Sequence, residues 1–310
     1  MKVIAVVGPT AVGKTALTLD LAEALKGEIV NLDSIQIYRM LDIGSAKPAP
    51  EEFRGIGHHL FGVISPFEDF TVSDYQKRAA EILEAVAARG KVPILSGGTG
   101  LYLSALYYKM DFNQAQEDPK LRASLYEMAA KEGKQRVHQI LCRQDPAVAK
   151  TIHPNNLKRV VRALEILSKK DQGIKTYRED LEKNPLYEMS LIGLTMDRKT
   201  LYDRIDQRVD LMMSQGLIDE VKYLKSLGLD DSFNSMKGIG YKEVVAYLNG
   251  EMDLQSTVAA IKQHSRRYAK RQLTWFRQYD AMAWFQVDAY PDSGQLLEDI
   301  EDHLRQEEGL

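Results

Sequence analysis

The segment that most constrains this chain is GPTAVGKT at residues 8–15. It fits G-x-x-x-x-G-K-[ST], a pattern in which backbone amides curl around an anion at a helix N-terminus. An apolar stretch at residues 2–7 precedes it, and Leu17, Leu21 and Leu25 follow at helical spacing. Strand, loop and helix therefore come in the order that the motif requires. The pattern indicates a phosphate-chain site and leaves the compound open.

Each part of the loop has an expected role. Lys14 reaches the outer phosphates, and the Thr15 hydroxyl is the expected ligand of Mg²⁺. The residues expected to bind the phosphate chain, which the family resemblance given below implies to be a diphosphate, are Gly8, Pro9, Thr10, Ala11, Val12, Gly13, Lys14 and Thr15.

The rest of the chain predicts an α/β fold with a parallel sheet, because buried strands alternate with helices. The strand candidates are residues 2–7, 28–33, 91–96, 191–196 and 282–287. A helix is predicted over 71–89, where Thr71 and Asp74 fit a capping box and Gly90 ends the helix. We expect a P-loop NTPase-like core, formed by residues 1–112 and 191–310. Residues 113–190 are polar and helical in pattern, with helix starts indicated at Asp118-Pro119 and His153-Pro154, and are interpreted as a helical insertion domain.

Two further strand ends carry candidate site residues. Asp33 follows the second strand, at the edge of the sheet where ligands bind, and could be a general base, a metal ligand or a turn cap. Gly97-Gly98-Thr99-Gly100 follows the next strand, and its glycines permit either close approach to a ligand or a tight turn. That strand ends in Ser96 without a terminal acid, which argues against an ordinary ATPase.

The charge distribution leaves room for a polyanionic partner. The net charge is only −3, but residues 286–310 carry eight acids and one base, so the remainder is positive. Six bases and no acid lie between Lys262 and Arg277, interleaved with aromatic residues. Taken alone, this segment favours a solvated charged helix with Trp275 and Phe276 in the core. The alternative is an RNA-binding face, and residues 158–162 pose the same choice.

Several classes are excluded. Cys142 is the only cysteine, so no intrachain disulfide forms and a reducing cytoplasm is expected. The apolar runs are far shorter than the ~20 residues that a membrane-spanning helix needs, so no membrane partner is expected. Histidine and cysteine show no metal-ligand spacing, and His58-His59 is interpreted as a turn or a polar pair.

Taken in order, the motifs resemble those of the tRNA dimethylallyltransferase family, the bacterial tRNA isopentenyltransferases. The segments are GPTAVGKT, DSIQIYRMLDIGSAKP, GGTGLYLSAL, HPNNLKRVVRALE, KGIGYKEV and KRQLTWFR. They span nearly the whole chain, and Ser45 stands where the family often has threonine. The resemblance implies transfer of a dimethylallyl group from its diphosphate to the exocyclic amine of an adenosine. That adenosine lies just 3′ of the anticodon, in tRNAs that read codons beginning with U. It also implies a P-loop core with a helical insertion, and a monomer.

The resemblance also implies residue roles. Asp33, Thr10 and Lys14 are the expected catalytic residues: Asp33 deprotonates or orients the amine, and Lys14 stabilises the departing diphosphate. The expected tRNA-binding residues are Asp33, Ser34, Ile35, Gln36, Thr99, Arg122, Lys158, Arg159, Val160, Val161, Arg162, Lys237, Gly238, Ile239, Gly240, Tyr241, Lys242, Lys270, Arg271, Gln272, Leu273, Thr274, Trp275, Phe276 and Arg277. With this assignment, the basic helices are predicted to bind RNA.

Three rivals share some of these features. A small-molecule kinase with a P-loop does not explain the basic, aromatic helix. An isopentenyltransferase acting on free adenine nucleotides does not need the insertion. A tRNA-binding protein without catalysis leaves the phosphate loop and Asp33 unexplained.

Overall fold

The computed structural model describes residues 1–110, 118–168 and 181–308. The chain divides into two compact units. The larger comprises Met1–Tyr107 with Asn184–Leu310, and the smaller comprises Tyr108–Lys183. Each unit is described by itself.

The larger unit is built on a six-stranded parallel sheet. Its strands are β1 Lys2–Val7, β2 Gly27–Asn31, β3 His58–His59, β4 Val92–Gly97, β5 Glu188–Thr195 and β6 Met282–Gln286. Their order across the sheet is β3-β2-β4-β1-β5-β6. All the carboxyl ends therefore meet at one edge, and β1 with its phosphate loop lies in the interior of the sheet. The predicted parallel α/β fold class is confirmed.

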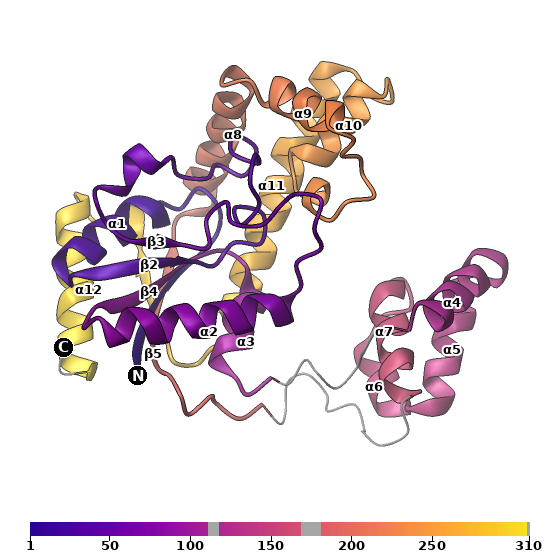
Figure 1. Cartoon of the computed structure of the whole chain (residues 1–310), viewed down its shortest axis with the longest axis horizontal. Helices are drawn as coiled ribbons and strands as arrows, with labels where there is room; N and C mark the ends of the chain where they lie inside the picture. The colour runs from indigo at the N-terminus through magenta and orange to yellow at the C-terminus, as the bar shows by residue number, and fades with distance from the viewer. Residues whose placement is uncertain (111–117, 169–180, 309–310) are drawn as a thin grey trace. The chain divides into compact units, whose positions relative to one another are not determined.

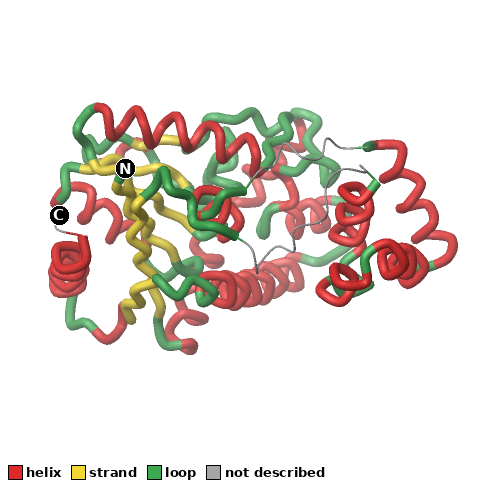
Figure 2. Tube along the Cα trace, turned by 90° about the horizontal axis from the view of Figure 1, so that it is seen from below, coloured by secondary structure: helices red, strands yellow, loops and turns green. Residues whose placement is uncertain are grey.

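Helices flank this sheet (Figure 2). They are α1 Lys14–Ala24, α2 Val72–Ala88, α3 Gly100–Tyr107, α8 Arg198–Ser214, α9 Leu217–Ser226, α10 Tyr241–Leu248, α11 Leu254–Phe276 and α12 Ser293–Glu308. Three short 3-10 turns complete the unit, at Pro50–Phe53, Ser235–Lys237 and Val287–Ala289. Side chains of alternate strand residues, such as Ile4 and Val6, pack in one core cluster with apolar residues of α1, α8 and α12. No helix in the described ranges is long and apolar enough to span a membrane.

The smaller unit contains the helices α4 Pro119–Glu132, α5 Lys134–Gln144, α6 Pro146–Thr151 and α7 Leu157–Leu167 (Figure 1). They enclose a core of their own that includes Leu125, Leu141 and Val160. The helix start predicted at Asp118-Pro119 is confirmed, since the Asp118 carboxylate accepts a hydrogen bond from the Leu121 amide. His153-Pro154 instead forms a turn, and α7 begins three residues later.

The local predictions differ from the structure in three places. The second strand ends at Asn31 and not at Asp33, because the Asp33 carboxylate turns the chain. His58-His59 forms the short edge strand β3, with His59 Nε2 2.7 Å from the Glu28 carboxylate. The acidic tail forms α12, an element that the sequence analysis did not predict. Leu296, Ile300 and Leu304 bury one side of it against the core.

Candidate active site

The phosphate loop leaves the carboxyl end of β1 and enters α1 at Lys14. A Cβ on Gly8 would lie 2.7 Å from the Leu194 carbonyl oxygen, so strand β5 leaves room for glycine only. Gly13 has a φ of 106°, which glycine adopts without strain. Lys14 Nζ donates hydrogen bonds to the carbonyl oxygens of Gly8 and Pro9, at 3.0 and 2.8 Å. The ammonium group is thereby held over the loop.

The electrostatic surroundings of Lys14 are unusual for a lysine. Burial of its ammonium group, followed by the nearby Arg208 guanidinium, lowers the pKa of Lys14 to about 7. The Asp33 carboxylate acts in the opposite direction and raises this pKa. A neighbouring cation destabilises the protonated form of a lysine, and a bound anion stabilises that form again. Lys14 is therefore suited to bind an anion.

We expect Lys14 to show its low pKa in competitive acetylation. Only the neutral amine reacts, so labelling of Lys14 should reach half its maximum near pH 7. Exposed Lys77 on α2 is the internal control for reagent delivery, and its labelling is followed in the same digests. Peptide mass spectrometry measures both residues in one sample. Inorganic diphosphate should shift the Lys14 curve to higher pH. A half-maximum for Lys14 near the ordinary lysine pKa of about 10.4 would contradict the assignment.

Asp33 lies two residues beyond β2 and caps a turn. Its Oδ1 accepts hydrogen bonds from the amides of Ile35 and Gln36, at 2.8 and 3.3 Å. The Thr99 hydroxyl supports the same turn by accepting from the Ser34 amide at 3.0 Å. Within the described ranges, Oδ2 has no hydrogen-bond partner. Asp33 therefore caps the turn through Oδ1, and its Oδ2 is available to take part in a reaction.

A cavity of about 530 Å³ opens beside the phosphate loop. Loop residues, Asp33, and residues of α8 and α11 line it together. Its charged lining residues are Lys14, Asp33, Arg204 and Arg208, so three cations face one carboxylate. That balance favours an anionic ligand such as a diphosphate.

A second cavity of about 320 Å³ shares five lining residues with the first. These are Thr10, Asp33, Ser45, Arg208 and Tyr268. Four bases border the second cavity, namely Arg208, Lys237, Lys242 and Arg271. Its apolar lining residues are Ile35, Ile205, Val209, Met212, Ile239 and Ile261. A flat apolar group that carries phosphates matches such a lining.

Sequence reasoning missed Arg208 and Tyr268, which lie in the wall between the two cavities. Arg208 has no ion-pair or hydrogen-bond partner among the described residues, and burial lowers its pKa while the Asp33 carboxylate raises it. Burial and then the Asp33 charge raise the pKa of Tyr268 well above its ordinary value. Arg208 is one of several charged residues on α8, and no local pattern distinguishes it.

Gln272, a predicted tRNA contact, hydrogen-bonds the phosphate loop and the turn after β4. Its Oε1 accepts from the Thr10 amide at 2.9 Å, and its Nε2 donates to the Gly98 carbonyl at 2.9 Å. A Cβ on Gly98 would lie 2.1 Å from that Nε2, and one on Gly100 would lie 2.2 Å from the Trp275 ring. The glycines after β4 therefore admit side chains of α11, and Gly98 also borders the first cavity.

The predicted RNA-binding face of α11 divides by exposure. The exposed residues are Lys270, Arg271, Thr274 and Arg277, and they lie on one side of the helix. Phe276 is fully buried, Leu273 and Trp275 are partly buried, and Arg266 pairs with Asp206. The same four side chains would face only solvent in the solvated-helix interpretation and would contact RNA in the RNA-binding interpretation.

The predicted segment 237–242 divides in the same way. Lys237, Gly238, Ile239 and Lys242 line the second cavity. Gly240 precedes α10, and its amide donates to the Glu243 carboxylate at 2.7 Å. Tyr241 is fully buried, and its hydroxyl donates to Glu220 at 2.8 Å. Tyr241 therefore has no side-chain surface to offer to RNA.

In the smaller unit, the predicted contacts Arg122 and Arg162 converge on the buried Glu165 carboxylate. Arg122 Nε lies 3.0 Å from one oxygen and Arg162 Nη1 lies 2.6 Å from the other. Burial alone would raise the pKa of Glu165, but the hydrogen bonds from Arg122 and the Asp118 amide lower it. Lys158 and Arg159 are exposed, whereas Val160 and Val161 are core residues.

The fold and the loop define an α/β protein with a phosphate-loop motif at the carboxyl edge of its parallel sheet. A family model described as IPP transferase matches residues 36–279, and the chain belongs to this family.

Similar proteins carry related names. A tRNA dimethylallyltransferase of Alkaliphilus metalliredigens is 48% identical over 286 residues, which cover 92% of each chain. A tRNA isopentenylpyrophosphate transferase of Bacillus halodurans has a crystal structure that matches with a TM-score of 0.74 at 41% identity, over 98% of this chain and 96% of that one. A eukaryotic dimethylallyltransferase described as acting on tRNA matches with a TM-score of 0.79 at 26% identity, over 98% and 79%.

Proposed function

We propose that this chain transfers a dimethylallyl group from dimethylallyl diphosphate to a tRNA adenosine and releases diphosphate. The acceptor is the exocyclic amine of the adenosine 3′-adjacent to the anticodon, in tRNAs reading codons that begin with U. The names of the relatives support the reaction class. The anticodon stem-loop is the proposed partner. We further propose that the protein is a monomer and that it is cytoplasmic. Cys142 is the single thiol, which suits a reducing compartment.

One observation carries the proposal: Asp33 and Arg208 lie in the wall shared by two cavities of different chemistry. The first cavity contains the phosphate loop and suits the diphosphate of the donor. The second has basic and apolar walls and suits a base extracted from a nucleic acid. A dimethylallyl group that moves from a donor in the first cavity to an acceptor in the second must pass the residues that line both cavities.

The reaction breaks the bond between donor carbon C1 and the diphosphate oxygen and forms a bond from C1 to the adenine amine nitrogen. Negative charge grows on the departing diphosphate, and Lys14, Arg208 and the loop amides stabilise it. The amine loses a proton, for which Asp33 Oδ2 is the proposed acceptor. Thr10 lines both cavities and is proposed to orient the diphosphate next to the reacting carbon.

Magnesium fits the donor set of the first cavity. Within the described ranges, no three metal-ligating side chains form a cluster. Mg²⁺ commonly uses few protein ligands together with substrate phosphates and water. The Thr15 hydroxyl and the Asp33 carboxylate line the same cavity and would hold the ion in that way. When bound, the ion would supply charge stabilisation for the leaving diphosphate.

The basic face of α11 gives a prediction about salt. Arg271→Gln should weaken tRNA binding and reduce the slope of log affinity against log salt by about one, because one phosphate contact is lost. Arg277→Gln should act in the same direction. Lys222→Gln on α9, which changes an exposed lysine paired with Asp219, is the matched control and should leave the slope unchanged. If the slope is unchanged in both arginine variants, this face of α11 does not contact RNA and is a solvated charged surface.

The proposed function itself is tested by offering the acceptors of its rivals in parallel. The protein is incubated with dimethylallyl diphosphate and either unmodified tRNA or AMP, and separately with ATP. Mass analysis should find a five-carbon unit on tRNA nucleosides only. Modified AMP would favour the free-nucleotide transferase, and ATP turnover without prenyl transfer would favour the kinase.

A further inference from the structure

A loop at residues 42–47 forms part of the wall between the two cavities. Ser45 lines both of them, and Gly44 lines the second. The loop belongs to a long connection from β2 to β3 with little regular structure. Long connections of this kind are usually functional, and side chains must hold them in place.

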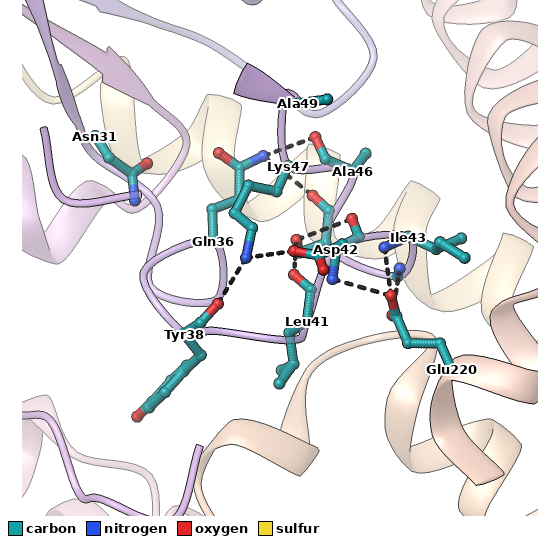
Figure 3. Close-up of polar contacts among 12 residues, drawn as sticks. Asn31, Gln36, Tyr38, Leu41, Asp42, Ile43, Ala46, Lys47, Ala49 and Glu220 are labelled. Carbon is teal, nitrogen blue, oxygen red and sulfur yellow. Dashed lines mark hydrogen bonds and ion pairs between the residues drawn. The ribbon is translucent and has the colours of Figure 1, made fainter. Parts of the chain in front are cut away.

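Glu220 on α9 holds the first half of this loop. Its Oε2 accepts from the amides of Asp42 and Ile43, at 3.0 and 2.7 Å, and its Oε1 accepts from the Gly44 amide at 3.0 Å (Figure 3). The Tyr241 hydroxyl donates to the same Oε1 at 2.8 Å. Three successive amides around one carboxylate form an anion-binding nest, here filled by the protein's own side chain.

Other contacts hold the second half. Gln36 Nε2 donates to the carbonyl oxygens of Ser45 and Ala46, at 3.1 and 3.0 Å (Figure 3). Lys47 Nζ donates to the Tyr38 carbonyl at 2.8 Å and pairs with Asp42. Gln36 itself lines the first cavity. Gln36, which lines the first cavity, therefore holds the second half of the loop, and Glu220 of α9 holds the first half.

The fit between this loop and Tyr241 is close. A Cβ on Gly44 would lie 2.6 Å from the Tyr241 ring, so only glycine allows this approach. Burial, followed by the Glu220 charge, raises the pKa of Tyr241 well above its ordinary value, so the hydroxyl stays protonated and donates. Glu220 and Tyr241 line neither cavity, and they act through the loop.

We propose that Glu220, with Tyr241, is a positioning residue for prenyl transfer, because it sets the wall that separates the donor cavity from the acceptor cavity. The inference rests on the proposed function. Misplacing a wall by about 1 Å is enough to cost on the order of 10²-fold in rate. Binding of tRNA should change little, because Glu220 lines neither cavity and is not among the proposed RNA contacts.

The test compares Glu220→Gln with the parent in single-turnover transfer at saturating tRNA. Glutamine keeps the size but replaces one accepting oxygen with an NH₂ group that faces the donors of the nest. Transfer per bound tRNA should fall on the order of 10²-fold, with tRNA affinity within about threefold. Asp219→Asn, at the neighbouring exposed position, is the matched control and should transfer at the parent rate.

Hydrogen exchange supplies a second readout. Amides 42–44 should exchange faster in Glu220→Gln, while β1 and β4 keep their protection. Parent transfer rates in this variant would overturn the inference, whether or not exchange changes. The inference would also be overturned if the variant transfers less only because fewer molecules are folded, and each folded molecule transfers at the parent rate.

Tyr241→Phe keeps the test decisive if Glu220→Gln does not fold. It removes a single donor to the carboxylate and should slow transfer about tenfold, the factor that corresponds to one hydrogen bond to a charged group. A parent rate would contradict the inference. Absence of transfer by the parent protein would overturn the proposed function and this inference together, whereas parent transfer with unaffected variants overturns this inference alone.

Discussion

Asp33→Asn is expected to lower single-turnover transfer on the order of 10²-fold or more, the range for a lost general acid–base group. The amide oxygen of asparagine can still accept the hydrogen bonds from Ile35 and Gln36, so the turn should persist. The loss then reports on the carboxylate charge and basicity. Affinity for tRNA should change far less, because Asp33 is only one of many residues proposed to contact the RNA. Asp203→Asn, an exposed change on α8, is the matched control.

A magnesium titration separates the two chemical roles of Asp33. A metal-ligand variant should recover towards the parent rate at high Mg²⁺, and a general-base variant should not. Recovery would remove the general-base role. Activity near that of the parent at every Mg²⁺ concentration would remove Asp33 from the mechanism.

Lys14→Ala is expected to lower transfer on the order of 10²- to 10³-fold, as for the loss of one group that stabilises developing charge. The substitution removes the cation over the phosphate loop and leaves the exposed bases of α11 untouched. Binding of tRNA, measured by filter retention, should therefore stay within a few-fold of the parent.

Lys77→Ala on α2 is the control for Lys14→Ala, since this exposed lysine lines neither cavity. It should leave both transfer and binding unchanged. An equal loss of tRNA affinity and turnover in Lys14→Ala would show that the lysine serves the RNA as well as the diphosphate.

The predictions that succeeded rest on short-range patterns. The order of strand, loop and helix around residues 8–15 follows from glycine spacing and local hydrophobic periodicity, and β1 and α1 begin and end close to the predicted residues. The capping box at Thr71 is confirmed in both directions, because each residue of the Thr71–Asp74 pair hydrogen-bonds the other's amide. Such features need no knowledge of tertiary structure.

The missed features depend on contacts between distant segments. Gln272 reaches the Thr10 amide across 262 residues of sequence, and Glu220 reaches the 42–44 amides from another helix. Arg208 becomes distinctive only when the fold places it beside Asp33 with no ion-pair partner among the described residues. The helix α12 is different, because Leu296, Ile300 and Leu304 repeat at helical spacing, so its buried side is indicated by the sequence alone.

In the proposed reaction, one five-carbon unit passes from the first cavity to the second and onto one adenosine of tRNA. The most direct test measures diphosphate release and prenylated tRNA in the same reaction and locates the modified nucleotide by mass sequencing of RNase fragments. We expect equal amounts of both products, with the unit on the adenosine 3′-adjacent to the anticodon. Modification at another position, or diphosphate release without modified tRNA, would contradict it.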